Sequence, residues 1–201
     1  NTASVIDAAT GKVVATVPVG VEPEGVSVSP DGRLVYVTAE TTHTISVVDT
    51  TALRVVATIL VGSRPRESAF TPDGKRAFVT AEIGGVVSVI DVARHAVIAT
   101  LRIDRPGPKP KGVVVHPGGK WAYVANGGSG DVAVIDVEAG TVAGYVPVGR
   151  RPWGLALTPD GRKLYVANGV SNDVSVIDTA SRTVVATIPA GKGPWGVAVG
   201  R

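Results

Sequence analysis

The residue types best suited to metal binding gather in the first half of the chain. One histidine and several glutamates could supply nitrogen and carboxylate-oxygen ligands to a divalent cation. These residues are Glu22, Glu24, Glu40, His43, Glu67 and Glu82. No recognised metal-ligand spacing connects them, and Arg64 and Arg66 lie in the same segments and would neutralise much of their charge. We therefore assign no metal site and keep Glu40, His43 and Glu82 only as the residues that a metal would use.

A second set of residues shares one position, directly after a regularly spaced proline. The set is Glu24, Arg66, Lys111, Trp153 and Trp195. The chain contains only three tryptophans, so two at equivalent positions are informative. Large aromatic side chains beside basic residues such as Arg151 form anchor sites for peptides, sugars or flat ligands. We predict that this set and Arg151 bind a ligand or partner. The alternative is that each indole only covers the junction between two structural units.

The sequence shows no constellation for nucleophilic catalysis. The chain contains no cysteine, which excludes thiolate chemistry, cysteine-based zinc sites and covalent haem attachment. A nucleophilic hydroxyl would need a histidine and a carboxylate within reach, and only the threonine-rich segment around His43 approaches that composition. His95 and His116 stand in expected turns and are interpreted as solvent-facing substitutions. We predict no catalytic residue and no bound cofactor.

Four landmarks recur along the chain in one register. Two of them are a turn such as TPDG (158–161) and a motif such as YVAN (165–168). The other two are a proline before a Val-rich run and an aspartate after an apolar run. They occur at Pro23, Pro65, Pro110, Pro152 and Pro194, and at Asp7, Asp49, Asp91, Asp136 and Asp178. Each series has intervals of 42 residues except for one of 45, which places a three-residue insertion in RPGPKP (105–110). This period indicates a repeat architecture.

Each repeat is predicted to form four short strands. In the last complete copy they are GLALT (154–158), KLYVAN (163–168), DVSVID (173–178) and TVVATIPA (183–190). Apolar and polar residues alternate with a period of two, as strands require. The Pro-Asp-Gly turn places glycine where φ is positive, and Asp178 can accept hydrogen bonds from the following backbone amides. Four-stranded units at this period are typical of propeller blades.

The segment PWGLALTPDGRKLYVANGVSNDVSVIDTASRTVVATIPAG (152–191) resembles the YVTN-type β-propeller repeat. The resemblance covers essentially the whole chain. Because this family is found in bacterial and archaeal surface and periplasmic proteins, it implies a periplasmic, extracellular or cell-surface location. It specifies the fold much more closely than the activity, since propellers host many functions.

We therefore predict an all-β fold, with residues 1–201 forming a single β-propeller domain of four-stranded antiparallel blades. Complete blades are expected at 23–64, 65–109, 110–151 and 152–193. Residues 1–22 would supply the third and fourth strands of a closing blade and residues 194–201 its first strand, with the second strand missing. Similar propellers close by combining strands from both termini, so a five-bladed monomeric ring is preferred. The alternative is a fragment of a larger propeller, whose open blade edge would favour an oligomer.

Three functions remain open on this evidence. The preferred one is a non-catalytic binding or interaction scaffold that takes a protein, peptide or glycan partner on the loop face around the channel mouth. The second is a metal-assisted hydrolase, lactonase or lyase on the same face, because related propellers include such enzymes, usually with a metal at the channel. The third is an accessory protein of a quinone- or haem-dependent oxidoreductase system. In that case the cofactor would belong to the partner.

Charge and hydropathy exclude two further classes of partner. Twenty Lys and Arg residues against seventeen Asp and Glu residues leave a net charge of +3, spread evenly along the chain. This balance does not favour nucleic acid or an anionic membrane surface, and no apolar segment is long enough to span a bilayer. The chain also lacks methionine, so Asn1 is not a translational start. We expect that a leader was removed or that the chain begins inside a longer protein.

Overall fold

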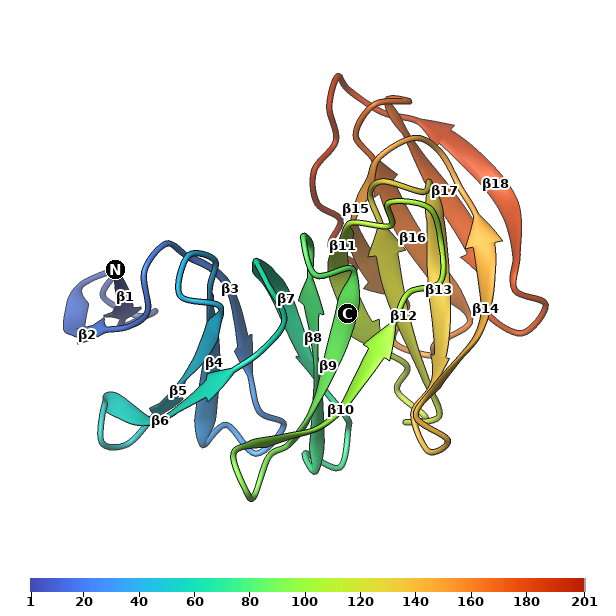
Figure 1. Ribbon diagram of the computed structural model, residues 1–201. Helices are drawn as coiled ribbons and strands as arrows, with labels where there is room; N and C mark the ends of the chain where they lie inside the picture. Colours follow the sequence, from blue (N-terminus) through green and yellow to red (C-terminus); the bar gives the residue numbers. More distant parts are fainter. Residues whose placement is uncertain (201) are drawn as a thin grey trace.

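The protein is built from β-strands alone (Figure 1). A computed structural model describes residues 1–200, and these residues form no helix, so none could cross a membrane as a helix. The strands are β1 (Thr2–Ile6), β2 (Val13–Pro18), β3 (Pro23–Val28), β4 (Leu34–Ala39), β5 (Thr44–Asp49), β6 (Arg54–Leu60), β7 (Pro65–Phe70), β8 (Arg76–Ala81), β9 (Val86–Asp91), β10 (Ala96–Arg102), β11 (Pro110–Val115), β12 (Trp121–Asn126), β13 (Asp131–Asp136), β14 (Thr141–Pro147), β15 (Pro152–Leu157), β16 (Lys163–Asn168), β17 (Asp173–Asp178) and β18 (Thr183–Pro189).

The strands pair into blades in chain order. Strands β3 to β6, β7 to β10, β11 to β14 and β15 to β18 each form one four-stranded antiparallel sheet, with the first and last strands of each group at its edges. In Figure 1 these four sheets follow one another in an arc, and the β1–β2 hairpin lies at its N-terminal end. The predicted all-β class and the four-stranded antiparallel blades are confirmed.

The turns form for the reasons that the repeat predicts. In the last blade, Gly161 adopts a φ of 73°, which glycine tolerates because it has no Cβ. Asp178 Oδ1 accepts the backbone N–H of Ser181 at 2.8 Å, which confirms its predicted role in the turn between the third and fourth strands. Because these turns recur in every complete blade, they fix the strand lengths and the positions where the loops leave the sheet.

The core lies between neighbouring blades. The second strands carry large aromatic side chains that are fully buried, such as Tyr36, Phe78 and Tyr123. Tyr36 packs against Phe70 of the next blade, with ring centroids 4.6 Å apart. Phe78 likewise belongs to one apolar cluster with Val113 of the following blade. A sheet that is apolar on both faces can bury them only against other sheets, so stacking in an arc is the physical result of this sequence pattern.

Hydroxyl groups add specific links between the inner strands of successive blades. The Thr38 hydroxyl accepts the backbone N–H of Gly25 at 2.7 Å and donates to the carbonyl oxygen of Arg66 at 2.9 Å. In the next blade, the Thr80 hydroxyl accepts the N–H of Glu67 at 3.2 Å and donates to the carbonyl oxygen of Lys111. These hydroxyls link the first strands β3, β7 and β11 of three successive blades.

The predicted closing blade is not formed. Strand β1 pairs only with β2, and residues 194–200 contain no strand. The physical reason is the strand that the prediction already lacked. In the complete blades the second strand joins the first strand to the third, so without it the C-terminal segment has no edge to pair with. Among residues 1–200 the arc therefore remains open, as the larger-propeller alternative predicts.

We predict that Thr80→Val destabilises the fold. The substitution preserves shape but leaves the Glu67 N–H and the Lys111 carbonyl without their partner, so the free energy of unfolding should fall by roughly 1–3 kcal/mol. Urea denaturation followed by circular dichroism measures the change. The control is Thr187→Val on the exposed outer strand β18, which should leave the midpoint unchanged. Equal midpoints for wild type and Thr80→Val would contradict the bridging role.

Candidate functional site

The five residues that follow the landmark prolines lie close together in the structure. Together they line one cavity of about 260 Å³, here called the mouth cavity. Its lining includes Glu24, Arg66, Lys111, Trp153 and Trp195, and also Glu67. The structure therefore brings together side chains that lie up to 171 residues apart in the chain. Four of them occupy the second position of the first strand of a blade, and Trp195 follows Pro194 outside any strand.

The backbone conformation before each landmark proline helps to place these side chains. Arg64 and Arg151, which directly precede Pro65 and Pro152, have φ values of 60° and 56°. This left-handed conformation turns the chain sharply from the outer strand of one blade into the inner strand of the next. The side chain after the proline consequently lines the mouth cavity. The side chain before it lies beside that cavity, with Arg64 bound to Glu40 and Arg151 over the Trp153 ring.

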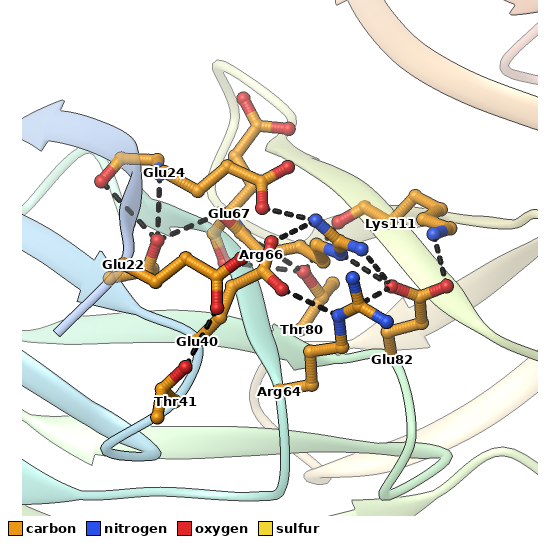
Figure 2. Close-up of polar contacts among 12 residues, drawn as sticks. Glu22, Glu24, Glu40, Thr41, Arg64, Arg66, Glu67, Thr80, Glu82 and Lys111 are labelled. Carbon is orange, nitrogen blue, oxygen red and sulfur yellow. Dashed lines mark hydrogen bonds and ion pairs between the residues drawn. The ribbon is translucent and has the colours of Figure 1, made fainter.

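Arg66 is the centre of a charged network that joins the first two complete blades (Figure 2). Its guanidinium binds the carboxylates of Glu24, Glu40 and Glu82. Arg64 binds Glu40 from the other side, with Arg64 Nε 2.5 Å from Glu40 Oε2. The side chains of Arg66 and Glu40 are 11% and 6% exposed, so these ion pairs are largely shielded from water and interact strongly.

Lys111 extends this network into the cavity. Its ammonium group binds Glu82 and lies 3.9 Å from the centre of the Trp153 ring. Burial, which disfavours the charged form, lowers the pKa of Lys111 to about 8, although the hydrogen bond to Glu82 acts in the opposite direction. Burial also raises the pKa of Glu82, but hydrogen bonds from Lys111 and Arg66 outweigh it, and the net direction is downward. Lys111 is thus a shielded ammonium that can lose its proton at mildly alkaline pH.

The two predicted indoles stack on one another. The ring centroids of Trp153 and Trp195 are 3.7 Å apart, with an interplanar angle of 32°. Arg151 lies over both rings, at 5.2 Å from the Trp153 centroid and 5.6 Å from that of Trp195. Trp195 remains 55% exposed. The two rings therefore pack on one another, and Trp195 leaves an apolar surface beside the Arg151 guanidinium open to solvent.

Glu67 differs from the other carboxylates of the site. Water reaches its side chain in the cavity, but neighbouring protein atoms crowd around it. This partial loss of hydration raises the pKa of the Glu67 carboxyl, although a hydrogen bond from the backbone N–H of Val113 acts the other way. Among residues 1–200, no cation lies within ion-pairing distance of Glu67. Two glutamates line the mouth cavity, and Glu24 is bound by Arg66. Glu67 has a raised pKa and, among residues 1–200, no cation bound to its carboxylate.

The residues named as metal candidates do not form a metal site. In the described part of the chain, no three histidine, aspartate or glutamate side chains are placed to hold one ion. The carboxylates of Glu40 and Glu82 are occupied by Arg64, Arg66 and Lys111. His43 Nδ1 lies 2.7 Å from the backbone oxygen of Glu40, so this ring nitrogen makes a hydrogen bond within its own loop. The residues present therefore do not fit the channel metal that the family resemblance implied.

The sequence comparison with known families gives a clear match. Residues 49–187, more than half of the chain, match the family model described as Lactonase, 7-bladed beta-propeller. No curated protein matches the sequence significantly.

Several solved structures share the fold at low sequence identity. A functionally unknown protein from Desulfotomaculum acetoxidans DSM 771 has a TM-score of 0.87 at 20% identity, over 98% of this chain and 66% of that one. A putative 6-phosphogluconolactonase from Bacteroides uniformis ATCC 8492 has a TM-score of 0.80 at 21% identity, over 96% and 66%. Kuenenia stuttgartiensis hydrazine synthase has a TM-score of 0.70 at 22% identity, over 97% and 82%. At these identities the likeness establishes the fold alone.

The family match overturns the function preferred from the sequence. A non-catalytic binding scaffold was expected because no catalytic triad or metal motif is present, and that prediction is wrong. Its weakness was the assumption that catalysis needs a recognisable motif. The match favours the hydrolase and lactonase alternative instead.

We predict that Arg66→Met destabilises the protein strongly. The substitution leaves three glutamates without their shared guanidinium in a shielded site, which should lower the free energy of unfolding by about 3 kcal/mol. The double variant Arg66→Met/Glu40→Gln removes one of the three carboxylates that lose Arg66 and should recover part of the loss. The control is Arg162→Met on the opposite face, whose side chain is 84% exposed, and it should have no measurable effect. Denaturant titrations of the four proteins test this, and a neutral Arg66→Met would refute the network's role.

Proposed function

Because the chain belongs to the lactonase family of seven-bladed β-propellers, we propose that its mouth cavity binds and hydrolyses a lactone or a closely related ester. The volume of about 260 Å³ suits a small molecule. The stacked indoles of Trp153 and Trp195 supply a flat apolar surface for the substrate ring. The cations beside them orient its polar atoms, and a carboxylate or phosphate group on the substrate would add to the attraction.

The observation that carries this proposal is the position of Lys111. Hydrolysis of a lactone develops negative charge on the carbonyl oxygen as water attacks the carbonyl carbon. A fixed cation in a shielded site stabilises that charge far better than water does. The Lys111 ammonium is 4% exposed, is held in place by Glu82, and faces the cavity beside Trp153. Arg66 lines the same cavity and adds a second cation.

Two further predictions from the sequence are retained as proposals. The YVAN-type motifs support assignment of the repeat to the YVTN type. The same resemblance supports a place of action in the periplasm, outside the cell or on its surface. Fractionation of the source cells, with detection of the chain by an antibody, would test the location.

We predict that the protein hydrolyses at least one member of a panel of five- and six-membered lactones, including phosphorylated and carboxylated ones. Acid release in a pH-stat measures the rate. Lys111→Met removes the cation that stabilises the oxyanion, so kcat should fall about 10²–10³-fold. The matched control is Lys120→Met, which lies on the opposite face beside Trp121 and should behave as wild type. A wild type that hydrolyses none of the panel, or a fully active Lys111→Met, would disprove the proposal.

The pH profile provides a separate prediction. Since the pKa of Lys111 is lowered to about 8, the ammonium form is lost as the pH rises through this value, and kcat should fall with it. Glu82→Gln removes the hydrogen bond that favours the ammonium, so the alkaline limb should move to lower pH. Lys111→Arg keeps its charge and should show no limb near pH 8. Identical alkaline limbs in all three proteins would assign the titration to another group.

A further inference from the structure

One position in the repeat, near the start of each first strand, is glycine in every copy except one. The residue two places after the landmark proline is Gly25, Gly112, Gly154 and Gly196 in four copies, and Glu67 in the second complete blade. A Cβ at Gly112 would lie 2.5 Å from the carbonyl oxygen of Trp153, and one at Gly154 would lie 2.8 Å from that of Trp195. The close approach of neighbouring first strands therefore selects glycine. The glutamate in the second complete blade is therefore an exception to a preference that close packing imposes on the other copies.

The Glu67 carboxylate lies at the interface that the glycine rule governs. Glu67 Oε2 is 3.1 Å from the position that a Cβ of Gly112 would occupy, so the carboxylate rests against the backbone of the next first strand. The backbone N–H of Val113 acts on the same carboxylate and favours its charged form. Glu67 lines the same cavity as Lys111 and Trp153. One carboxylate, one ammonium and one aromatic surface thus face a common space.

The charge of the other glutamates is already compensated. Glu24, Glu40 and Glu82 are each bound by Arg66, and Glu82 is bound by Lys111 as well. Their carboxylates cannot take up a proton without breaking those ion pairs. Glu67 has no such partner within residues 1–200, and its crowded surroundings raise the pKa of its carboxyl. A carboxylate in this condition is the stronger base and is free to accept a proton.

Resting on the proposed function, we infer that Glu67 is the general base that activates water against the lactone carbonyl in the mouth cavity. The proton of the water passes to a Glu67 carboxylate oxygen while the water oxygen bonds to the carbonyl carbon. The carbonyl electron pair moves onto the oxygen, where Lys111 stabilises it. Collapse of this intermediate breaks the ring C–O bond, and the departing alkoxide takes the proton from Glu67. The product is the hydroxy acid, and the carboxylate is restored.

The decisive variants are Glu67→Gly and Glu67→Gln. Glu67→Gly installs the residue that the repeat uses elsewhere, so the variant should fold with near wild-type stability. With the most active lactone of the panel, kcat should fall at least 10²-fold in both variants while KM changes little. The control is Glu138→Gln in the turn after β13 on the opposite face, which should keep the wild-type kcat. The acid limb of the wild-type pH profile should lie above the ordinary glutamate pKa, and it should be absent from the residual activity of Glu67→Gln.

Chemical rescue separates a base from a structural side chain. Sodium formate or azide can enter the space left in Glu67→Gly and accept the proton, so added anion should raise kcat in proportion to its concentration. The same anion should leave wild type and Lys111→Met unchanged. Full activity of either Glu67 variant, or a loss that no anion restores, overturns the assignment. If Glu67→Gly is as active as wild type while Lys111→Met is inactive, only this inference fails. If wild type hydrolyses no lactone, the proposed function fails with it.

Discussion

The close approach of neighbouring first strands around the channel governs how this protein is built. Each sheet is apolar on both faces and must pack against the next one. The strands nearest the axis come so close that a Cβ at Gly154 would lie 2.8 Å from the next backbone. This contact fixes the height of every inner strand relative to its neighbour. The residues after the landmark prolines are therefore forced into one ring, and any chemistry they carry is concentrated in a single cavity.

Convergence of this kind creates an electrostatic problem, which the charged network solves. Glu24, Glu40 and Glu82 would repel one another in a shielded space, and Arg66 neutralises them by binding all three. Arg64 and Lys111 complete the balance from either side. A guanidinium suits this place because its planar fork can donate to several carboxylates at once. The balance leaves Glu67 without a cation and Arg151 without a carboxylate among residues 1–200, so both remain available to a substrate.

Much of this arrangement could be predicted from the sequence because it repeats. The strands, the Pro-Asp-Gly turns and the ring of Glu24, Arg66, Lys111, Trp153 and Trp195 depend on local patterns that recur every 42 residues. The ion pairs could not be predicted in the same way. Arg66 reaches Glu40 and Glu82 only because two neighbouring blades pack together, and the repeat pattern does not specify that contact. The predicted closure of the ring is not observed, because a complete closing blade needs a second strand that residues 1–200 do not supply. The sequence favours a binding scaffold because a single carboxylate such as Glu67 forms no recognisable catalytic motif. The replacement of the repeated glycine by Glu67 is nevertheless visible in the sequence.

The position of Glu67 within the arc has a physical explanation in Thr80. The Thr80 hydroxyl accepts the N–H of Glu67 and donates to the carbonyl of Lys111, so one group ties the backbone of the base to that of the cation. In the third and fourth complete blades the equivalent residues are Ala125 and Ala167, which have no hydroxyl to offer. The first complete blade has Thr38, but there the bridge joins Gly25 to Arg66, and Arg66 is already bound by three carboxylates. Only the junction between the second and third blades combines the hydroxyl bridge with an ammonium that faces the cavity. A carboxylate introduced at this junction is held in register with Lys111, whereas at any other junction of the arc it would lack the bridge or the ammonium.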